Sequence, residues 1–229
     1  MVQETTPVLF YFGFRAKAEA VRLALAAAGV EFENQVLTHA DVPAVKKDPA
    51  AYPFGQIPRY RDGEVDLVQS GAILRYLGRR HGLYGAPAGA SEAEAARAAA
   101  LVDQLLEGVA DLRSRLVPLV YRPNLQTEEA KQEHWDLHVA PSAVDGPEVR
   151  GGHVLHLQRF IERHGQGGFA VGPSLTIADV ALLDLTDLYL SKHADKFSLV
   201  YPALADHHAK IAALPRIAAY LASPRRLPK

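Results

Sequence analysis

The sequence predicts two domains of different class, an α/β domain over residues 1–82 and an all-helical domain over residues 91–229. Short apolar strands alternate with helical patterns up to residue 81, whereas only helical patterns follow residue 91. Between them, residues 82–90 (GLYGAPAGA) are rich in glycine, alanine and proline, which is typical of a linker. The chain has 229 residues, of which 48% are hydrophobic, enough to bury one large core or two smaller ones.

The first domain is expected to contain a mixed sheet. VLFYF is a short apolar run typical of a buried strand, the helical pattern after it ends at Gly29, and Asp62-Gly63 predicts a hairpin turn. The predicted order of elements is β-α-β-α-β-β-α. The strands are residues 8–12, residues 31–37 and the runs on either side of Asp62-Gly63. The helices are residues 16–28, one short helix within the irregular connection 39–52, and residues 70–81. This order is a thioredoxin-like layout.

The second domain begins with a helix-capping signal, Ser91 followed by Glu94. Thr176 and Asp179 repeat this pattern before a run that is apolar almost all round, so we expect a central helix there, with a structural role. Pro118 lies near the end of the first helix and can kink it. The predicted helices are residues 91–119, 128–138, 153–164, 176–190, 203–213 and a short last helix from Pro215.

The stretch PFGQIPRYRDGEVDLVQSGAILRY, residues 53–76, suits the binding of a small peptide by its main chain and its carboxylate. Ile57-Pro58 precedes a strand and is a candidate for a cis bond in a tight turn. Such a turn leaves the Ile57 N–H and C=O outside the sheet, where a ligand backbone can pair with them. Ser70 stands at the expected helix N-cap, where unpaired N–H groups form an anion site.

This stretch resembles the glutathione-binding domain of the cytosolic glutathione transferases, in which P-F-G-Q-I-P and a Gln-Ser pair hold the tripeptide. Residues 9–30 (LFYFGFRAKAEAVRLALAAAGV) resemble the first strand, catalytic Tyr loop and first helix of the Tyr-type classes, with Sigma as first choice and Pi as second. GPSLTIADVALLDL is similar to the family's capping-box helix. The resemblance implies the glutathione transferase fold over almost the whole chain, with residues about 122–152 lacking a clear counterpart.

The resemblance implies that the chain conjugates the glutathione thiolate to hydrophobic, electrophilic small molecules. Tyr11 matches the Tyr that donates a hydrogen bond to the glutathione sulfur. A thiol has a pKa of about 8.5, and a hydrogen bond to the charged form lowers it. Arg15 and Lys17 follow in the catalytic loop and either can support Tyr11 or contact glutathione. Lys17 replaces an arginine of the family, which keeps the charge and loses the bidentate fork.

The peptide-binding residues are also carried over from the family. Val42 stands where Sigma and Pi members usually have a Trp that donates to the glycine carboxylate, and Lys46 is then left to hold that carboxylate, alone or with Lys47. Asp111 matches the acidic residue that dimers of these classes extend to the γ-glutamyl amine in the partner. The full predicted glutathione-binding set is Tyr11, Lys17, Lys46, Gln56, Ile57, Pro58, Gln69, Ser70 and Asp111.

A pocket for the second substrate is expected between Phe14 and the first helix of the second domain, with contributions from Leu116 and Tyr121. The family works as a homodimer and needs no metal or redox cofactor, because glutathione is the co-substrate. Two other functions stay open. One is a glutathione-dependent isomerase of the prostaglandin synthase type, and the other is a non-catalytic ligand-binding or structural protein such as a lens crystallin.

Composition narrows the remaining function classes. The net charge of −1 does not favour nucleic acid or an anionic membrane, and no apolar run approaches the ~20 residues of a membrane span. MVQETTPV lacks the features of a secretory signal, and the chain has no cysteine, so we expect a cytoplasmic protein without a thiol nucleophile of its own. Four histidines (His134, His138, His153 and His156) suggest a zinc site, but no acidic residue has a recognised metal spacing, so no metal is expected.

Overall fold

The computed structural model of this chain describes residues 6–86, 89–145 and 153–229. The contacts separate two compact units: unit 1 is Met1–His81 with Leu214–Lys229, and unit 2 is Gly82–Ala213. This grouping differs from the predicted helical domain, 91–229, at the C-terminal end. The cause is α9 (Pro215–Ala222), which packs against α1 (Glu19–Ala28) of unit 1.

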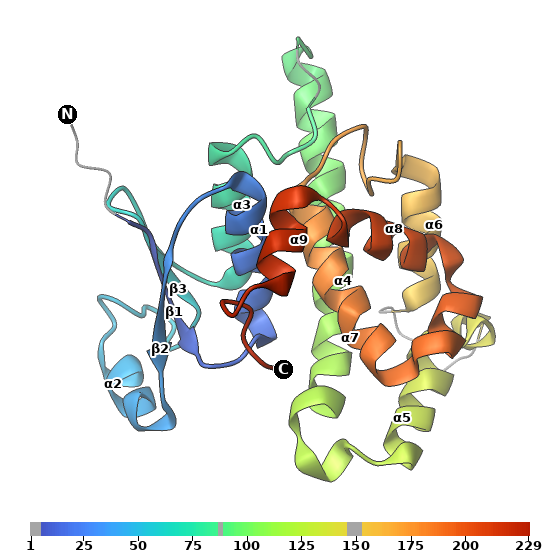
Figure 1. The fold of residues 1–229 in the computed structure, drawn as a ribbon, viewed down its shortest axis with the longest axis horizontal. Helices are drawn as coiled ribbons and strands as arrows, with labels where there is room; N and C mark the ends of the chain where they lie inside the picture. Colours follow the sequence, from blue (N-terminus) through green and yellow to red (C-terminus); the bar gives the residue numbers. More distant parts are fainter. Residues whose placement is uncertain (1–5, 87–88, 146–152) are drawn as a thin grey trace. The chain divides into compact units, whose positions relative to one another are not determined.

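Unit 1 is built on a mixed sheet of four strands in the order β2-β1-β3-β4 (Figure 1). The strands are β1 (Val8–Phe12), β2 (Glu33–Leu37), β3 (Arg59–Arg61) and β4 (Asp66–Val68). β1 pairs with β2 in parallel and with β3 antiparallel, and β3 pairs antiparallel with β4. Gly63, with φ of 90°, lies in the turn between β3 and β4, so the hairpin predicted at Asp62-Gly63 is confirmed.

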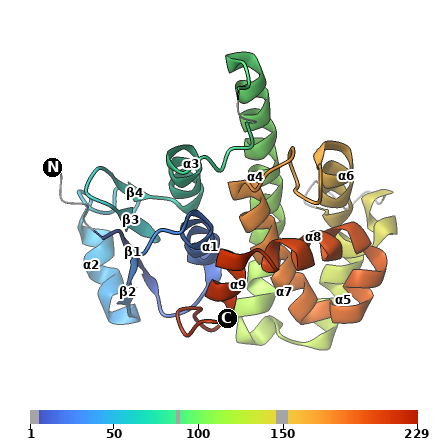
Figure 2. The same ribbon diagram turned by 45° about the horizontal axis from the view of Figure 1, so that its top comes forward.

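Helices cover both faces of this sheet. Figure 2 shows α1 and α3 (Ser70–Arg80) side by side on one face and α2 (Val42–Lys47) on the other, with a 3-10 turn, His39–Asp41, before α2. The predicted thioredoxin-like layout is therefore confirmed. Gly29 caps α1 in the left-handed region with φ of 73°, as predicted. The prediction for α3 was wrong by one residue: Gln69 is the N-cap and Ser70 is the first helical residue.

A buried ion pair joins α1 to its surroundings in unit 1. Glu19 and Arg22, one turn apart, each expose 1% of the side chain, and Arg22 Nη1 lies 3.3 Å from a Glu19 carboxylate oxygen. Arg22 also donates from Nε to Asn34 of β2 at 2.8 Å. Tyr220 of α9 donates to both oxygens of Glu19, at 3.2 and 3.1 Å. Burial raises the pKa of Tyr220, which keeps its hydroxyl protonated as a donor.

Unit 2 is helical, as predicted. The helices begin with α4 (Glu92–Tyr121), whose capping box of Ser91 and Glu94 is confirmed and which continues through Pro118. The other helices are α5 (Glu128–His134), α6 (Val154–His164), α7 (Ile177–Val200) and α8 (Pro202–Ala212). Short helical turns of unit 2 lie at Pro123–Leu125, Trp135–Val139 and Pro141–Asp145. A further short turn, Ala16–Ala18, precedes α1 in unit 1. Residues 146–152, part of the predicted segment without a family counterpart, lie outside the described residues.

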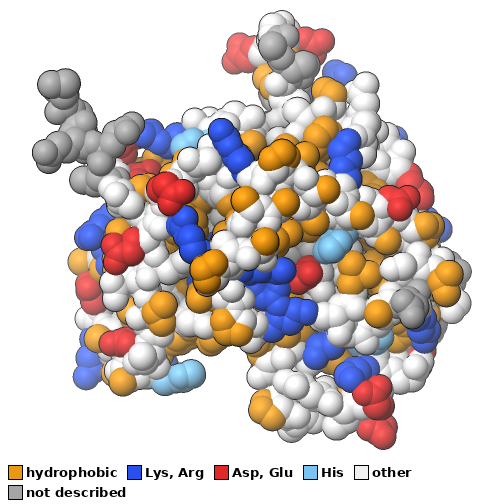
Figure 3. Space-filling view, in the orientation of Figure 1, with side chains coloured by type: hydrophobic (Ala, Val, Ile, Leu, Met, Phe, Trp, Pro, Cys, Tyr) orange, Lys and Arg blue, Asp and Glu red, His pale blue; other side chains and the backbone are white. Residues whose placement is uncertain are grey.

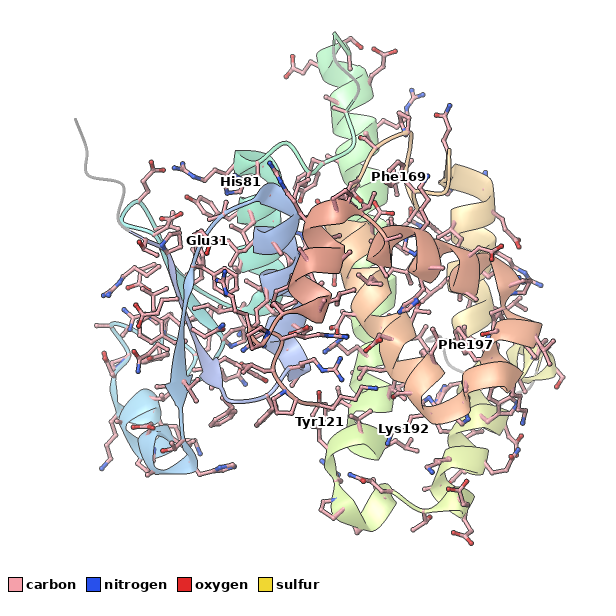
Figure 4. The ribbon with its side chains drawn as sticks, viewed as in Figure 1. Glu31, His81, Tyr121, Phe169, Lys192 and Phe197 are labelled. Carbon is pink, nitrogen blue, oxygen red and sulfur yellow. The ribbon has the colours of Figure 1, made fainter. Side chains whose placement is uncertain are left out.

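Helix α7 is longer than the predicted 176–190. It continues to Val200, with non-helical backbone at Ala194 (φ 8°, ψ −102°). Beyond the predicted end, Phe197 (Figure 4) is fully buried, with its ring centroid 5.2 Å from that of Tyr189. The helix ends at Val200, and the next residue, Tyr201, precedes Pro202, a position where proline disfavours helical backbone.

The N-terminus of α7 is held by a carboxylate with no exposed surface. Asp179 accepts hydrogen bonds from the N–H and hydroxyl of Thr176, at 2.7 and 2.8 Å, which confirms the predicted capping box. The same carboxylate also accepts from the Ala170 N–H at 2.7 Å and from His207 Nε2 at 2.9 Å. One side chain therefore ties together α7, α8 and the turn after α6.

The surface of the described residues carries both signs of charge. Figure 3 shows Lys and Arg side chains interspersed with Asp and Glu on the face drawn, in keeping with the net charge of −1. Among the described residues, no helix has both the length and the apolar character that a membrane crossing requires.

We predict that Asp179→Ala lowers the free energy of unfolding by about 3–5 kcal/mol, because four buried donors lose their acceptor. The matched control is Glu94→Ala, which removes the same capping motif from an exposed helix start and should cost about 1 kcal/mol or less. Urea denaturation of both variants measures the difference. Equal losses of unfolding free energy in the two variants would show that burial of the Asp179 network does not increase its contribution to stability.

Candidate functional site

One pocket of unit 1 lies where the end of β1 approaches the start of α2, the Ile57-Pro58 turn and the start of α3. Its volume is about 290 Å³, near the lower end of small-molecule sites. Its lining consists of Phe12, Lys17, Leu37, Thr38, Asp41, Val42, Val45, Gly55, Gln56, Ile57, Pro58, Gln69 and Ser70. The structure thus brings together most of the predicted peptide-binding residues, which are separated by up to 53 positions between Lys17 and Ser70.

The two predicted glutamines form one wall of this pocket. Gln69 Nε2 donates to Gln56 Oε1 at 3.1 Å, and Gln69 has φ of 71°, which is unusual for a residue with a side chain. Ser70 follows as the first residue of α3, so its N–H is among those that have no partner within the helix. The Ile57-Pro58 bond is cis, as predicted, and Ile57 packs against the cluster of Val45, Tyr52 and Val68.

Thr38 and Asp41 form a wall of the pocket that was not predicted from the sequence. Asp41 Oδ2 accepts from the Thr38 N–H at 2.7 Å and from its hydroxyl at 2.8 Å, closing a capping box before α2. These bonds, the backbone one first, lower the pKa of Asp41, so the carboxylate stays ionised. The T-x-x-D pattern in the sequence was the signal that could have found this wall.

The end of the pocket beside α2 has an apolar surface. Val42 and Val45 line it, whereas the exposed Lys46 does not. Lys46 is close by, because its Cα lies 3.7 Å from the position that a Cβ on Gly55 would occupy. The predicted carboxylate ligand therefore stands beside the pocket rim at Gly55.

Tyr11 lies on β1, one residue before the pocket-lining Phe12, and is 7% exposed. Its phenolic oxygen accepts a hydrogen bond from the Lys17 N–H at 3.3 Å. The guanidinium of Arg22 lies 6.0 Å from the centre of its ring, and Phe14 meets that ring edge-on at 5.8 Å. Tyr11 thus has the cationic Arg22 near its ring and the Lys17 N–H as a donor to its oxygen.

The loop that carries Lys17 has an unusual backbone. Ala16 has φ of 33°, a region that residues with a side chain seldom adopt and that surrounding contacts must maintain. Arg15, beside it, is 6% exposed, and its C=O accepts from Arg22 Nη1 at 3.4 Å. The predicted catalytic Arg15 is therefore a buried residue of the loop, whereas Lys17 lines the pocket.

The residues predicted for the second-substrate site come from both units, and the site stays a prediction. Leu116 is 0% exposed, and a side chain without exposed surface has none to offer a ligand, so we now place it in the core. Phe14 is half-buried in unit 1, where it stacks on Phe12 at 5.4 Å, and Tyr121 ends α4 of unit 2 (Figure 4). Asp111 is exposed on α4, and its predicted contact in a dimer stays a prediction.

The histidines of unit 2 pack with aromatic rings. The His134 ring lies 5.1 Å from that of His138 and 5.9 Å from that of Tyr189. Burial lowers the pKa of His134 to about 3. Across residues 6–86, 89–145 and 153–229, no group of three or more His, Cys, Asp or Glu has a geometry that could hold a metal.

Comparison with known proteins connects this geometry to one family. Models of the glutathione S-transferase N-terminal and C-terminal domains match residues 7–79 and 147–224. Glutathione S-transferase P 1 of Bufo bufo is 31% identical, over 94% of this chain and 91% of the relative. Glutathione S-transferase alpha-1 of Rattus norvegicus is also 31% identical, over 97% and 91%. The solved glutathione S-transferase of Ascaris lumbricoides is 31% identical, with a TM-score of 0.75 and 98% of both chains covered, and a Pi-class enzyme of Onchocerca volvulus is 25% identical, with a TM-score of 0.74 and coverage of 95% and 92%.

Proposed function

Because this chain belongs to the glutathione S-transferase family and is a glutathione transferase, we propose that the pocket of unit 1 binds glutathione and that Tyr11 activates its thiol. The observation that carries the proposal is the position of Lys17. This residue lines the pocket and donates its N–H to the Tyr11 oxygen. Lys17 therefore links the predicted catalytic hydroxyl to the predicted peptide site.

The chemistry follows from the pKa of the thiol. Free glutathione is mostly protonated at pH 7, because its thiol has a pKa of about 8.5. A hydrogen bond from the Tyr11 hydroxyl to the sulfur favours the thiolate and lowers that pKa. The Lys17 N–H polarises the Tyr11 oxygen and makes the hydroxyl a stronger donor. The thiol proton passes to solvent, and the thiolate attacks an electrophilic carbon of the second substrate. The C–S bond forms as the leaving group, the halide of an aryl halide, departs with its electron pair. Phe14 and Tyr121 are the proposed contacts of this substrate.

Backbone and side-chain donors hold the peptide in this proposal. The N-terminus of α3 and the Ser70 hydroxyl take the γ-glutamyl carboxylate, with Gln69 beside them. Ile57 pairs with the cysteinyl backbone next to Gln56, and Pro58 shapes the turn. Lys46 approaches the glycine carboxylate from the rim. Glutathione is the co-substrate, and we propose a reaction without a metal or redox cofactor.

The class within the family is also a proposal. The sequence suggested the Sigma class first and the Pi class second. Two relatives that are each 31% identical to this chain are named glutathione S-transferase P 1 and glutathione S-transferase alpha-1. One structural neighbour is a Pi-class enzyme. We therefore favour a Tyr-type enzyme closer to Pi and Alpha than to Sigma. A homodimer and a cytoplasmic location stay predictions.

We predict that Tyr11→Phe keeps the fold and glutathione binding but lowers kcat at neutral pH by about a hundredfold or somewhat less, as for other catalytic hydrogen-bond donors. The assay is conjugation of an aryl halide, run beside a glutathione titration. Tyr60→Phe is the control, because it removes another buried hydroxyl from the sheet, on β3. Near-normal turnover in Tyr11→Phe would remove Tyr11 as the activating residue. Glutathione binding without turnover in the parent chain would instead favour a non-catalytic protein.

We predict a homodimer in which Asp111 contacts the γ-glutamyl amine of the glutathione molecule that is bound to the partner subunit. Asp111→Asn should then weaken glutathione binding about tenfold, the loss of one charge-assisted hydrogen bond. Glu162→Gln, which neutralises an exposed carboxylate on α6, should leave the affinity unchanged. Sedimentation that shows a fully active monomer at micromolar concentration would contradict the prediction.

We predict that Val42→Trp tightens glutathione binding, since the indole N–H adds a donor at the glycine end, where a hydrogen bond to a charged group is worth about 1.5–3 kcal/mol. Lys46→Ala should weaken binding more in the parent chain than in Val42→Trp. Titration calorimetry on the parent, both single variants and the double variant measures this coupling. If Lys46→Ala leaves the affinity unchanged, the glycine carboxylate is held by other residues.

A further inference from the structure

We infer that the C-terminal segment, residues 223–228, is a positioning element for Tyr11, an inference that rests on the proposed role of Tyr11. The segment follows α9 within unit 1 and runs beside α1 (Figure 1). The Pro228 C=O accepts a hydrogen bond from the Arg15 N–H at 2.9 Å. A residue near the end of the segment thereby holds the catalytic loop by its main chain.

The C-terminal segment is itself anchored at two further points. Arg225 donates to the Glu31 carboxylate and to the Phe32 C=O, both at 2.7 Å (Glu31 is labelled in Figure 4). Arg226 Nε lies 3.6 Å from the buried Glu19 carboxylate. These contacts fix the path of the segment along α1, so the Pro228 C=O reaches the loop in a defined position.

The loop needs such restraint. Ala16, between Arg15 and Lys17, has φ of 33°, and a backbone of this kind persists only when its neighbours hold it. On one side of Ala16, Arg22 Nη1 donates to the Phe14 C=O at 3.3 Å and to the Arg15 C=O at 3.4 Å. Pro228 supplies the bond to the Arg15 N–H. Together these bonds hold the peptide groups on the N-terminal side of Ala16, and the backbone of Ala16 then sets the direction of the Lys17 N–H.

The Lys17 N–H is the donor to the Tyr11 oxygen, at 3.3 Å. Its direction therefore decides how strongly the Tyr11 hydroxyl can donate to a thiolate. The charged groups around this loop are Arg15, Lys17, Arg22, Glu19 and Arg226. Arg226 is the one that belongs to the C-terminal segment, and a chain that ends after Arg226 keeps its charge and loses only the backbone bond from Pro228. The segment lines none of the peptide pocket, whose walls come from residues 12–70. Its loss should act on the thiol and on turnover, with little effect on glutathione affinity.

The first test compares a chain stopped after Arg226, which lacks the Pro228 acceptor, with a chain stopped after Pro228, in which a carboxylate oxygen of Pro228 takes the place of its amide oxygen as the acceptor. The pKa of enzyme-bound glutathione is read from the ultraviolet absorbance of the thiolate, and kcat and KM are measured with an aryl halide. In the shorter chain we expect the thiol pKa to rise by about half a unit or more, which is about a threefold loss of thiolate. KM for glutathione should change less than about twofold in both chains, and the longer chain should match the parent.

A second pair of variants leaves the C-terminal segment intact. Arg15→Pro removes the N–H that donates to Pro228, and the φ of −68° at Arg15 suits proline. Arg15→Ala removes the same guanidinium and keeps the N–H. The thiol pKa should be higher in Arg15→Pro than in Arg15→Ala. If the chain stopped after Arg226 does not fold, this pair of variants still tests whether the bond between Arg15 and Pro228 affects the thiol pKa.

Tyr11→Phe separates the two claims. If it leaves the thiol pKa at the parent value, the proposed role of Tyr11 fails, and the positioning inference fails with it. If Tyr11→Phe raises the thiol pKa while the shorter chain and Arg15→Pro behave like their controls, the inference alone is overturned. A lower melting temperature of the shorter chain with an unchanged thiol pKa would also overturn the inference. It would show that the C-terminal segment stabilises the fold and does not position Tyr11.

Discussion

Arg22 is a buried cation whose hydrogen bonds reach three separate segments of unit 1. It donates to Glu19 on its own helix, to Asn34 of β2, and to the main chain of Phe14 and Arg15. Burying a charge is costly unless partners surround it, so this arrangement persists only when all of these segments are in place. The strand, the catalytic loop and α1 therefore adopt their positions together, and α9 joins them through Tyr220. The position of Tyr11 is a consequence of this shared constraint.

The peptide pocket has two ends of different character. At one end, the start of α3 offers N–H groups and Ser70, with Gln69 held by Gln56. At the other end, Val42 stands where relatives are expected to have a Trp donor, and Val45 and the ionised Asp41 line the pocket beside it. An anion is thus favoured at α3 and less so at α2, where Lys46 stands outside the lining. In the proposed binding mode, we therefore expect the γ-glutamyl end to contribute most of the binding and the glycine end least.

The sequence predicted the strands, the hairpin at Asp62-Gly63, the cis bond before Pro58 and the capping box at Thr176, because each depends on neighbours in the chain. It missed contacts between distant segments. The bond from Arg15 to Pro228 and the burial of Leu116 arise from tertiary packing, which no local pattern encodes. The predicted end of α7 was wrong because the helix continues to Val200, where buried Phe197 packs against Tyr189, a contact that no local pattern encodes. Thr38 and Asp41 had a local signal, but nothing in it pointed to a ligand.

The position of the glutathione sulfur relative to Tyr11 tests this account most directly. A crystal structure of the full chain with a glutathione conjugate measures it. The account predicts the γ-glutamyl group at Ser70 and Gln69, the cysteinyl backbone at Ile57, and the sulfur within hydrogen-bonding distance of the Tyr11 hydroxyl, with the bond from Lys17 intact. A conjugate bound outside the pocket, or bound inside it with the sulfur out of reach of Tyr11, would contradict the account.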